Sequence, residues 1–235
     1  MTDELELNVN AVDNNGRSAF MKACEGQSLE IMQIFLLYAK SKKINLNQQD
    51  FEGNSGFILA AKYPYHGTMQ ILFKNAKKFG IDVNLRNQNG ETAFIAACIE
   101  SDLFDLTNIE SFVQNATKIG IDLNIADNIG QTGFIKICAV KDLDIYDQVK
   151  QAKIIECLLK HSESVGLDVN ETDDNWMTGF MWACKLKRFR AVEKFIKHSE
   201  AKGGIDLEAT NIHGLTGYDM WPKYFKKRHL FKFKG

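Results

Sequence analysis

The chain has 235 residues, of which 45% are hydrophobic and 25% charged, with a formal net charge of −1, so it can bury a core and stay in water. No apolar run approaches the roughly 18 residues that span a bilayer, and the two prolines, Pro64 and Pro222, are few for a loop-rich fold. The acidic residues 1–6 lack the basic and apolar parts of a secretory signal, so we expect an intracellular, cytoplasmic location, with a nuclear one left open.

A string of similar residues recurs along the chain. It spans residues 10–20, 47–57, 84–94, 124–134 and 170–180, with a degenerate sixth copy at 208–218. Its aromatic residue is Phe20, Phe57, Phe94, Phe134, Phe180 or Tyr218, at steps of 37, 37, 40, 46 and 38 residues. Repeats of this period indicate a solenoid, in which each unit is one supersecondary element.

Each unit predicts the same local structure. An Asp/Asn-x-x-Gly turn comes first, where glycine accepts a left-handed backbone. A helix N-cap follows at Ser18, Ser55, Thr92, Thr132, Thr178 or Thr216. A short helix such as 92–98 and a longer one such as 28–39 come next. Most second helices are expected to stop near a glycine, namely Gly80, Gly120, Gly166 or Gly203.

With these features the chain resembles the ankyrin-repeat family over about residues 8–222. That family carries Asp-x-x-Gly-x-Thr-Pro-Leu-His before a helix of small residues. Here the last part reads, for example, Thr132-Gly133-Phe134-Ile135. The family's histidine is replaced by Met21, Ile58, Ile95, Ile135 and Met181, where we expect apolar packing instead of hydrogen bonds.

The resemblance implies an all-α ankyrin-repeat solenoid, a single domain over 1–235. Helix-turn-helix units joined by β-turn or hairpin loops should fill about 8–44, 45–81, 82–121, 122–167 and 168–205. A partial repeat and basic cap would occupy 206–235. We expect turns and first helices to form a concave surface, and an insertion at 141–149 to lie in the loop between the helices of repeat four. The Asp-x-x-Gly turn disfavours TPR and HEAT arrays.

Cysteine and histidine patterns give no reason to expect a metal or cofactor. Cys24, Cys98, Cys138 and Cys184 share one first-helix position, with Ala61 between them, and helices 8–10 Å apart separate such residues too far for disulfides. His161 and His198 lie at equivalent ends of two second helices, where the helix dipole stabilises cationic side chains. A shared ligand site with Glu163 and Glu200 would lack a zinc-type pattern.

No catalytic or phosphate-binding motif occurs, so we expect no enzyme activity. Ankyrin arrays typically bind proteins. The C-terminal segment is basic and aromatic, carrying Lys223, Lys226, Lys227, Arg228, Lys232 and Lys234, whereas residues 1–219 have 23 basic and 30 acidic residues. We expect this tail to cap the last repeat. Contact with nucleic acid or an anionic surface is its alternative role.

Repeat five differs from its neighbours at Trp176, which replaces the turn glycine. Asn175 should take the left-handed turn and leave Trp176 projecting. Trp182 falls at a first-helix position that varies among repeats (Lys22, Leu59, Ala96 and Lys136), and such variation indicates a surface site. Alternatively, Trp182 packs against the inserted loop and Trp176 against the neighbouring turn.

A partner is therefore expected to dock across repeats five and six, on Trp176 and Trp182. His213 would extend this site, and Lys185 and Arg188 would give its edge positive charge. The matching segment would be acidic or aromatic. The chain would then be an adaptor or scaffold that binds another protein, of unknown identity, through its concave surface. The alternative is a structural subunit fixed inside a larger assembly.

Overall fold

The computed structural model describes residues 8–26, 28–63, 66–99 and 105–221, which form eleven helices joined by turns and short hairpins. The first helices of the repeats are α1 (Ala19–Glu25), α3 (Gly56–Lys62), α5 (Ala93–Ile99), α7 (Gly133–Ala139) and α9 (Gly179–Lys185). The second helices are α2 (Leu29–Tyr38), α4 (His66–Phe79), α6 (Leu106–Ile119), α8 (Ile145–Val165) and α10 (Phe189–Lys202). A last turn, α11 (Gly217–Met220), follows α10.

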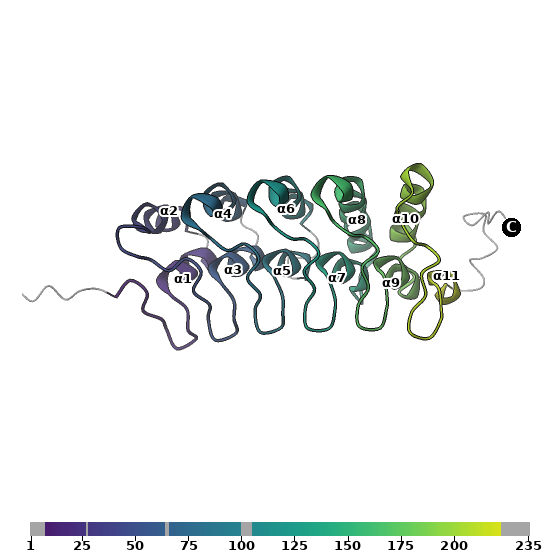
Figure 1. Ribbon diagram of the computed structural model, residues 1–235, viewed down its shortest axis with the longest axis horizontal. Coiled ribbons are helices and arrows are strands. Elements are labelled where there is room, and N and C mark those ends of the chain that lie inside the picture. The colour runs from purple at the N-terminus through teal and green to yellow at the C-terminus, as the bar shows by residue number, and fades with distance from the viewer. Residues whose placement is uncertain (1–7, 27, 64–65, 100–104, 222–235) are drawn as a thin grey trace, which may run out of the picture.

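The helices form two parallel rows, and the hairpins project beyond the row of first helices (Figure 1). Each helix packs against the equivalent helix of the next repeat, as α3 does on α5 and α8 on α10. The stacked helix pairs therefore form one continuous hydrophobic core, whereas a single pair could not bury its own apolar face. The predicted all-helical solenoid is confirmed. None of the described helices is long and apolar enough to cross a membrane.

Every hairpin turn is closed by its leading Asp or Asn. In repeat four, the Asp127 carboxylate accepts the amides of Ile129 at 3.0 Å and Gln131 at 2.8 Å. The N-cap follows at once, where Thr132 Oγ1 accepts the amide of Ile135 at 3.3 Å. The six predicted Ser/Thr caps all make this bond. Local side chains thus satisfy amides that a helix start leaves unpaired.

An asparagine joins each repeat to the next. Asn124 donates its side-chain amide to the Gly166 carbonyl at 2.7 Å and accepts the Asp168 amide at 2.8 Å. The same two bonds recur at Asn10, Asn47, Asn84 and Asn170. Both ends of each amide are used, which fixes the spacing between successive repeats.

The core repeats one packing arrangement at successive junctions. The five first-helix phenylalanines are each 1% exposed. A Cβ built on Gly56, Gly133, Gly179 or Gly217 would lie 3.0–3.3 Å from the cysteine sulfur of the preceding repeat. Ala93 replaces this glycine at the junction where Ala61 replaces the cysteine. The residues that replace the family's histidine are also buried, as expected.

Residues 145–149 of the insertion in repeat four belong to a helix, so the loop predicted for residues 141–149 is wrong in part. Residues 140–144 form the connection, and α8 already begins at Ile145. Asp144 caps α8 by accepting the amide of Asp147 at 2.8 Å, and Gln151 is buried where its side chain donates to the Ile137 carbonyl at 2.7 Å. These two bonds stabilise the extra turns.

Candidate functional site

Trp176 lies at the tip of the fifth hairpin, where its backbone is left-handed at φ 58° and the residue is 60% exposed. The equivalent residues of the other hairpins are glycines, all with positive φ: Gly16, Gly53, Gly90, Gly130 and Gly214. The projecting ring is as predicted. The prediction that Asn175 takes the left-handed conformation is wrong. The turn closes where the Met177 amide donates to Asp173, and the left-handed residue is the one directly before Met177, which is Trp176.

The glycines allow neighbouring hairpin tips to approach closely. A Cβ on Gly53 would lie 2.8 Å from the backbone nitrogen of Gln88 in the next tip. The first three tip-to-tip backbone hydrogen bonds are 2.9–3.0 Å long. The two that flank the Trp176 hairpin, Asp174 N to Ile129 O and Ile212 N to Asn175 O, are 3.4 and 3.2 Å. The tryptophan thus sits in a hairpin that is held less closely by its neighbours.

Three exposed apolar side chains flank Trp176 on adjoining hairpins. Ile129 is 55%, Ile212 48% and Leu215 44% exposed. We call Ile129, Trp176, Ile212 and Leu215 the hairpin ridge. Ile129, Ile212 and Leu215 were not among the predicted site residues, although each is an apolar residue within a turn that is otherwise mostly polar. His213, a predicted site residue, is exposed on the same turn as Ile212.

Trp182 is half-buried beneath this ridge and packs against the core. Its indole N–H donates to Asp173 Oδ2 at 2.9 Å, and Gln131 Nε2 donates to the same oxygen at 3.2 Å. The Lys185 ammonium lies 4.5 Å from the centre of the Trp182 ring, a cation–π contact. Trp182 therefore has polar and apolar partners within its own chain.

The equivalent positions in other repeats explain why Trp182 is held in this way. Lys136 pairs with Asp127 at 2.6 Å, and Lys22 with Asp13 at 3.5 Å. In each case the fourth residue of the first helix reaches back to the turn carboxylate of its own repeat. Trp182 makes the corresponding contact with a neutral donor. This contact satisfies a buried carboxylate, since Asp173 is 3% exposed.

Arg188 does not supply charge at the edge of the predicted site, because it is only 8% exposed. Its Nη2 donates to the Val140 carbonyl at 2.9 Å, so it ties the start of α10 to the end of α7. Burial lowers the pKa of its guanidinium, and nearby Asp142 partly opposes that effect. Lys185 remains exposed and is the predicted cation that contacts Trp182.

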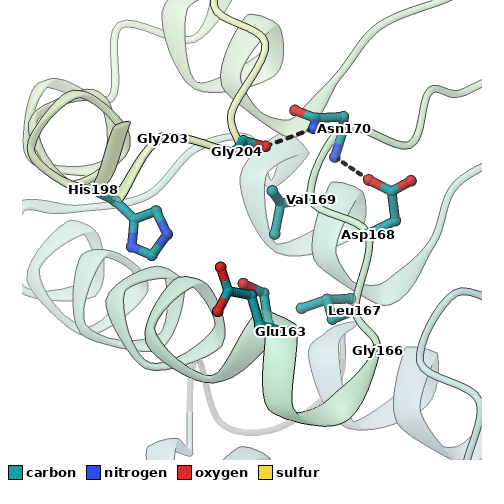
Figure 2. A pocket seen from close by; sticks show the side chains of 10 residues that line it. Glu163, Gly166, Leu167, Asp168, Val169, Asn170, His198, Gly203 and Gly204 are labelled. Carbon is teal, nitrogen blue, oxygen red and sulfur yellow. Dashed lines mark hydrogen bonds between the residues drawn. The ribbon is translucent and has the colours of Figure 1, made fainter. Parts of the chain in front are cut away.

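Two clefts lie between α8 and α10, away from the ridge. One of about 290 Å³ is lined by His198 and Glu163, which project into it, and by the loops after both helices (Figure 2). The other, of about 240 Å³, is lined by several lysines, of which Lys194 pairs with Glu156 at 2.7 Å. Among the described residues, no three His, Cys, Asp or Glu side chains are placed to hold a metal ion.

The five cysteines are all free thiols. Cys24, Cys98, Cys138 and Cys184 are buried, and burial raises the pKa of each thiol well above its usual range. Cys157 on α8 is half-buried, and its pKa is also raised by burial. The predicted basic tail, from Lys223 to Lys234, lies outside the described residues.

The structure matches the crystal structure of an ankyrin repeat protein with a TM-score of 0.64. The two sequences are 18% identical, and the match covers 82% of this chain and 86% of that chain. At this identity the match shows the fold alone. No protein-family model matches the sequence, and no curated protein matches it.

Proposed function

The chain has the ankyrin-repeat fold, and from this premise we propose that it is a non-enzymatic adaptor or scaffold that binds another protein. The partner docks on the hairpin ridge, centred on Trp176 in repeat five. Ankyrin-repeat folds typically serve protein binding and are generally not catalytic. The hairpin tips form an uninterrupted row of turns joined by hydrogen bonds, which suits an extended or convex partner surface.

The conformation of Trp176 carries this proposal. A left-handed backbone costs a non-glycine residue about 1–2 kcal/mol, a cost that the glycines of the other five hairpins avoid. An exposed tryptophan also favours aggregation. Two unfavourable features at one residue are kept where a local functional gain offsets them. Tryptophan is among the residues that contribute most to binding hot spots, because it buries a large area.

The other predicted site residues take different parts in this surface. His213 lies on the sixth turn beside Ile212, where a partner covering the ridge would contact it. Trp182 lies behind the ridge and supports the turn through Asp173, and Lys185 contacts the Trp182 ring. Arg188 fixes the connection between repeats and has no direct role in docking.

Affinity capture with two matched variants tests the proposal. Trp176→Gly restores the glycine of the other hairpins, whereas Phe51→Asn removes another exposed tip aromatic, 67% exposed in repeat two. A partner captured by the wild-type chain should be lost with Trp176→Gly and kept with Phe51→Asn. Equal capture by both variants would place the docking site elsewhere, provided that circular dichroism shows both to be folded.

One observation favours a second function, that of a subunit fixed in a larger assembly. The helix α2 exposes Ile31, Ile34, Leu37 and Tyr38 at 48, 55, 73 and 48%. Residues equivalent to Ile31 in later repeats, such as Thr68 and Ala191, are covered and at most 3% exposed. The position of Leu37 holds exposed Lys74, Gln114, Lys160 or Lys197 elsewhere.

An apolar face of this kind is expected where another subunit stays bound. If Leu37→Lys, and not Trp176→Gly, abolishes co-purification of the partner, the chain is held through α2 and the assembly role replaces the adaptor role.

A further inference from the structure

The hairpins of the C-terminal half carry charge of one sign. Residues 120–132, 166–178 and 203–216 contain eight Asp/Glu and no Lys/Arg. The first three hairpins, 8–18, 44–55 and 80–92, contain five acidic residues together with Arg17 and Arg86. The acidic hairpins are the ones that present the hairpin ridge.

Most of these carboxylates face solvent on the three hairpins. The exposed ones are Asp122, Asp168, Glu171, Asp174, Asp206 and Glu208. Of the two buried ones, Asp127 is paired with Lys136. Asp173 is held by neutral donors, namely Trp182, Gln131 and the amides of Asn175 and Met177. No ion pair to Asp173 exists within the described part of the chain, so its charge adds to the negative field of the ridge.

The opposite side of the molecule has the opposite sign. The five second helices contain eleven Lys/Arg and seven Asp/Glu. They form the row that lies away from the hairpins (Figure 1). The negative charge is therefore a property of the hairpin side. A surface lined by one sign of charge attracts and orients partners of the other sign.

We propose that the partner segment that docks on the hairpin ridge is both basic and apolar, with Lys or Arg side chains among aliphatic or aromatic ones. This inference rests on the proposed function and assigns the chemistry of its partner. The apolar side chains would cover Ile129 and Ile212. A Lys or Arg of the partner would lie over the exposed Trp176 ring and gain cation–π energy. The long aliphatic part of a Lys or Arg side chain can pack on the ridge while its charged group reaches the carboxylates of the hairpins.

The charge of the hairpins disfavours the acidic partner segment expected from the sequence. That expectation relied on positive charge from Lys185 and Arg188. Arg188 is buried, and Lys185 is in contact with Trp182 behind the ridge. The aromatic part of the expectation is retained, because aromatic side chains suit the exposed apolar ridge.

Fluorescence anisotropy with the full chain and three labelled twelve-residue peptides tests the inference. The peptides alternate Lys with Leu, Lys with Ser, and Glu with Leu. The Lys/Leu peptide should bind, and binding should weaken as salt rises. The other two should bind at least about tenfold more weakly, because each lacks one half of the complementarity. Equal or tighter binding of the Glu/Leu peptide would overturn the assignment of a basic partner.

Matched variants separate the inference from the proposed function. The double variant Glu171→Gln/Glu208→Gln should bind the Lys/Leu peptide more weakly, and that binding should depend less on salt. The control variant Glu30→Gln/Glu52→Gln should show neither change. Suppose that Trp176→Gly weakens binding of the captured partner, but the charge variants leave the affinity for the Lys/Leu peptide unchanged. Docking on the ridge then stands, and the preference for a basic partner is wrong. If Trp176→Gly changes neither ligand, the docking site itself is wrong.

The chain's own C-terminal segment is an alternative occupant, because it is basic and aromatic. Lys226→Glu/Lys227→Glu/Arg228→Glu removes that match in the full chain. An unchanged affinity for the Lys/Leu peptide supports a partner from another protein. An affinity at least about tenfold higher would show that this segment competes for the ridge, and the assignment to an external partner would fail.

Discussion

Trp182 donates its indole N–H to Asp173 at 2.9 Å, in the place where Lys136 pairs with Asp127 one repeat earlier. The same first-helix position thus satisfies the turn carboxylate with a neutral donor in one repeat and a cation in the other. The tryptophan is part of the structure of its own repeat, which separates it from the exposed Trp176.

This relationship predicts opposite outcomes for two substitutions of Trp182. Trp182→Ala leaves the buried Asp173 short of a donor and should lower the free energy of unfolding by about 1–3 kcal/mol. Trp182→Lys restores the pairing seen at Lys136 and should recover most of that loss. Urea denaturation followed by circular dichroism measures both. Equal stability of the two variants would contradict the role given to the indole N–H.

Trp176→Gly should leave the free energy of unfolding unchanged or raise it by up to about 1 kcal/mol. The substitution removes the left-handed strain, although glycine also adds entropy to the unfolded chain. Phe51→Asn serves as the control for loss of an exposed aromatic. A drop of more than about 1 kcal/mol on Trp176→Gly would mean that the ring is needed for folding.

The junction between Cys24 and Gly56 predicts a coupled pair. A Cβ on Gly56 would lie 3.1 Å from Cys24 Sγ and 2.9 Å from Phe20 Cε1, so Gly56→Ala should cost about 1–3 kcal/mol through overpacking. Adding Cys24→Ala should return part of that loss, because Ala61 and Ala93 form this combination at the next junction. A double-mutant cycle measures the coupling, and additive effects would contradict it.

Thiol reactivity should single out Cys157. Thiols react as thiolates, so a raised pKa lowers the reactive fraction at a given pH. The four first-helix cysteines are buried with strongly raised pKa values, whereas Cys157 is half-buried. Iodoacetamide at pH 8 should modify Cys157 first, and all five thiols should react only after denaturation. Rapid modification of Cys98 in the native protein would contradict the packing.

Local patterns were sufficient to predict the repeat. The Asp/Asn-x-x-Gly turn, the Ser/Thr cap and the helix stops depend on residues within a few positions of one another, so spacing alone indicates them. The buried cysteines follow from the same periodicity. These features account for the confirmed solenoid and the buried side chains that replace the family histidine.

The contacts of the site depended on residues brought together by folding. Arg188 is buried and donates to the carbonyl of Val140, which lies 48 residues earlier in the chain. No local pattern indicates this contact. Trp182 is held by an aspartate on the turn before its helix. The helical form of residues 145–149 depends on the Asp144 cap and on the burial of Gln151. The asymmetry in charge was visible in the sequence but acquired meaning only once hairpins and second helices lay on opposite sides.

A partner is proposed to cover the hairpin ridge. Amide hydrogen exchange of the full chain, with and without the captured partner, tests it most directly. Docking on the ridge predicts added protection in peptides that cover 126–132, 172–178 and 210–216, with little change in α2. Protection concentrated in α2, with the three hairpins unchanged, would contradict it.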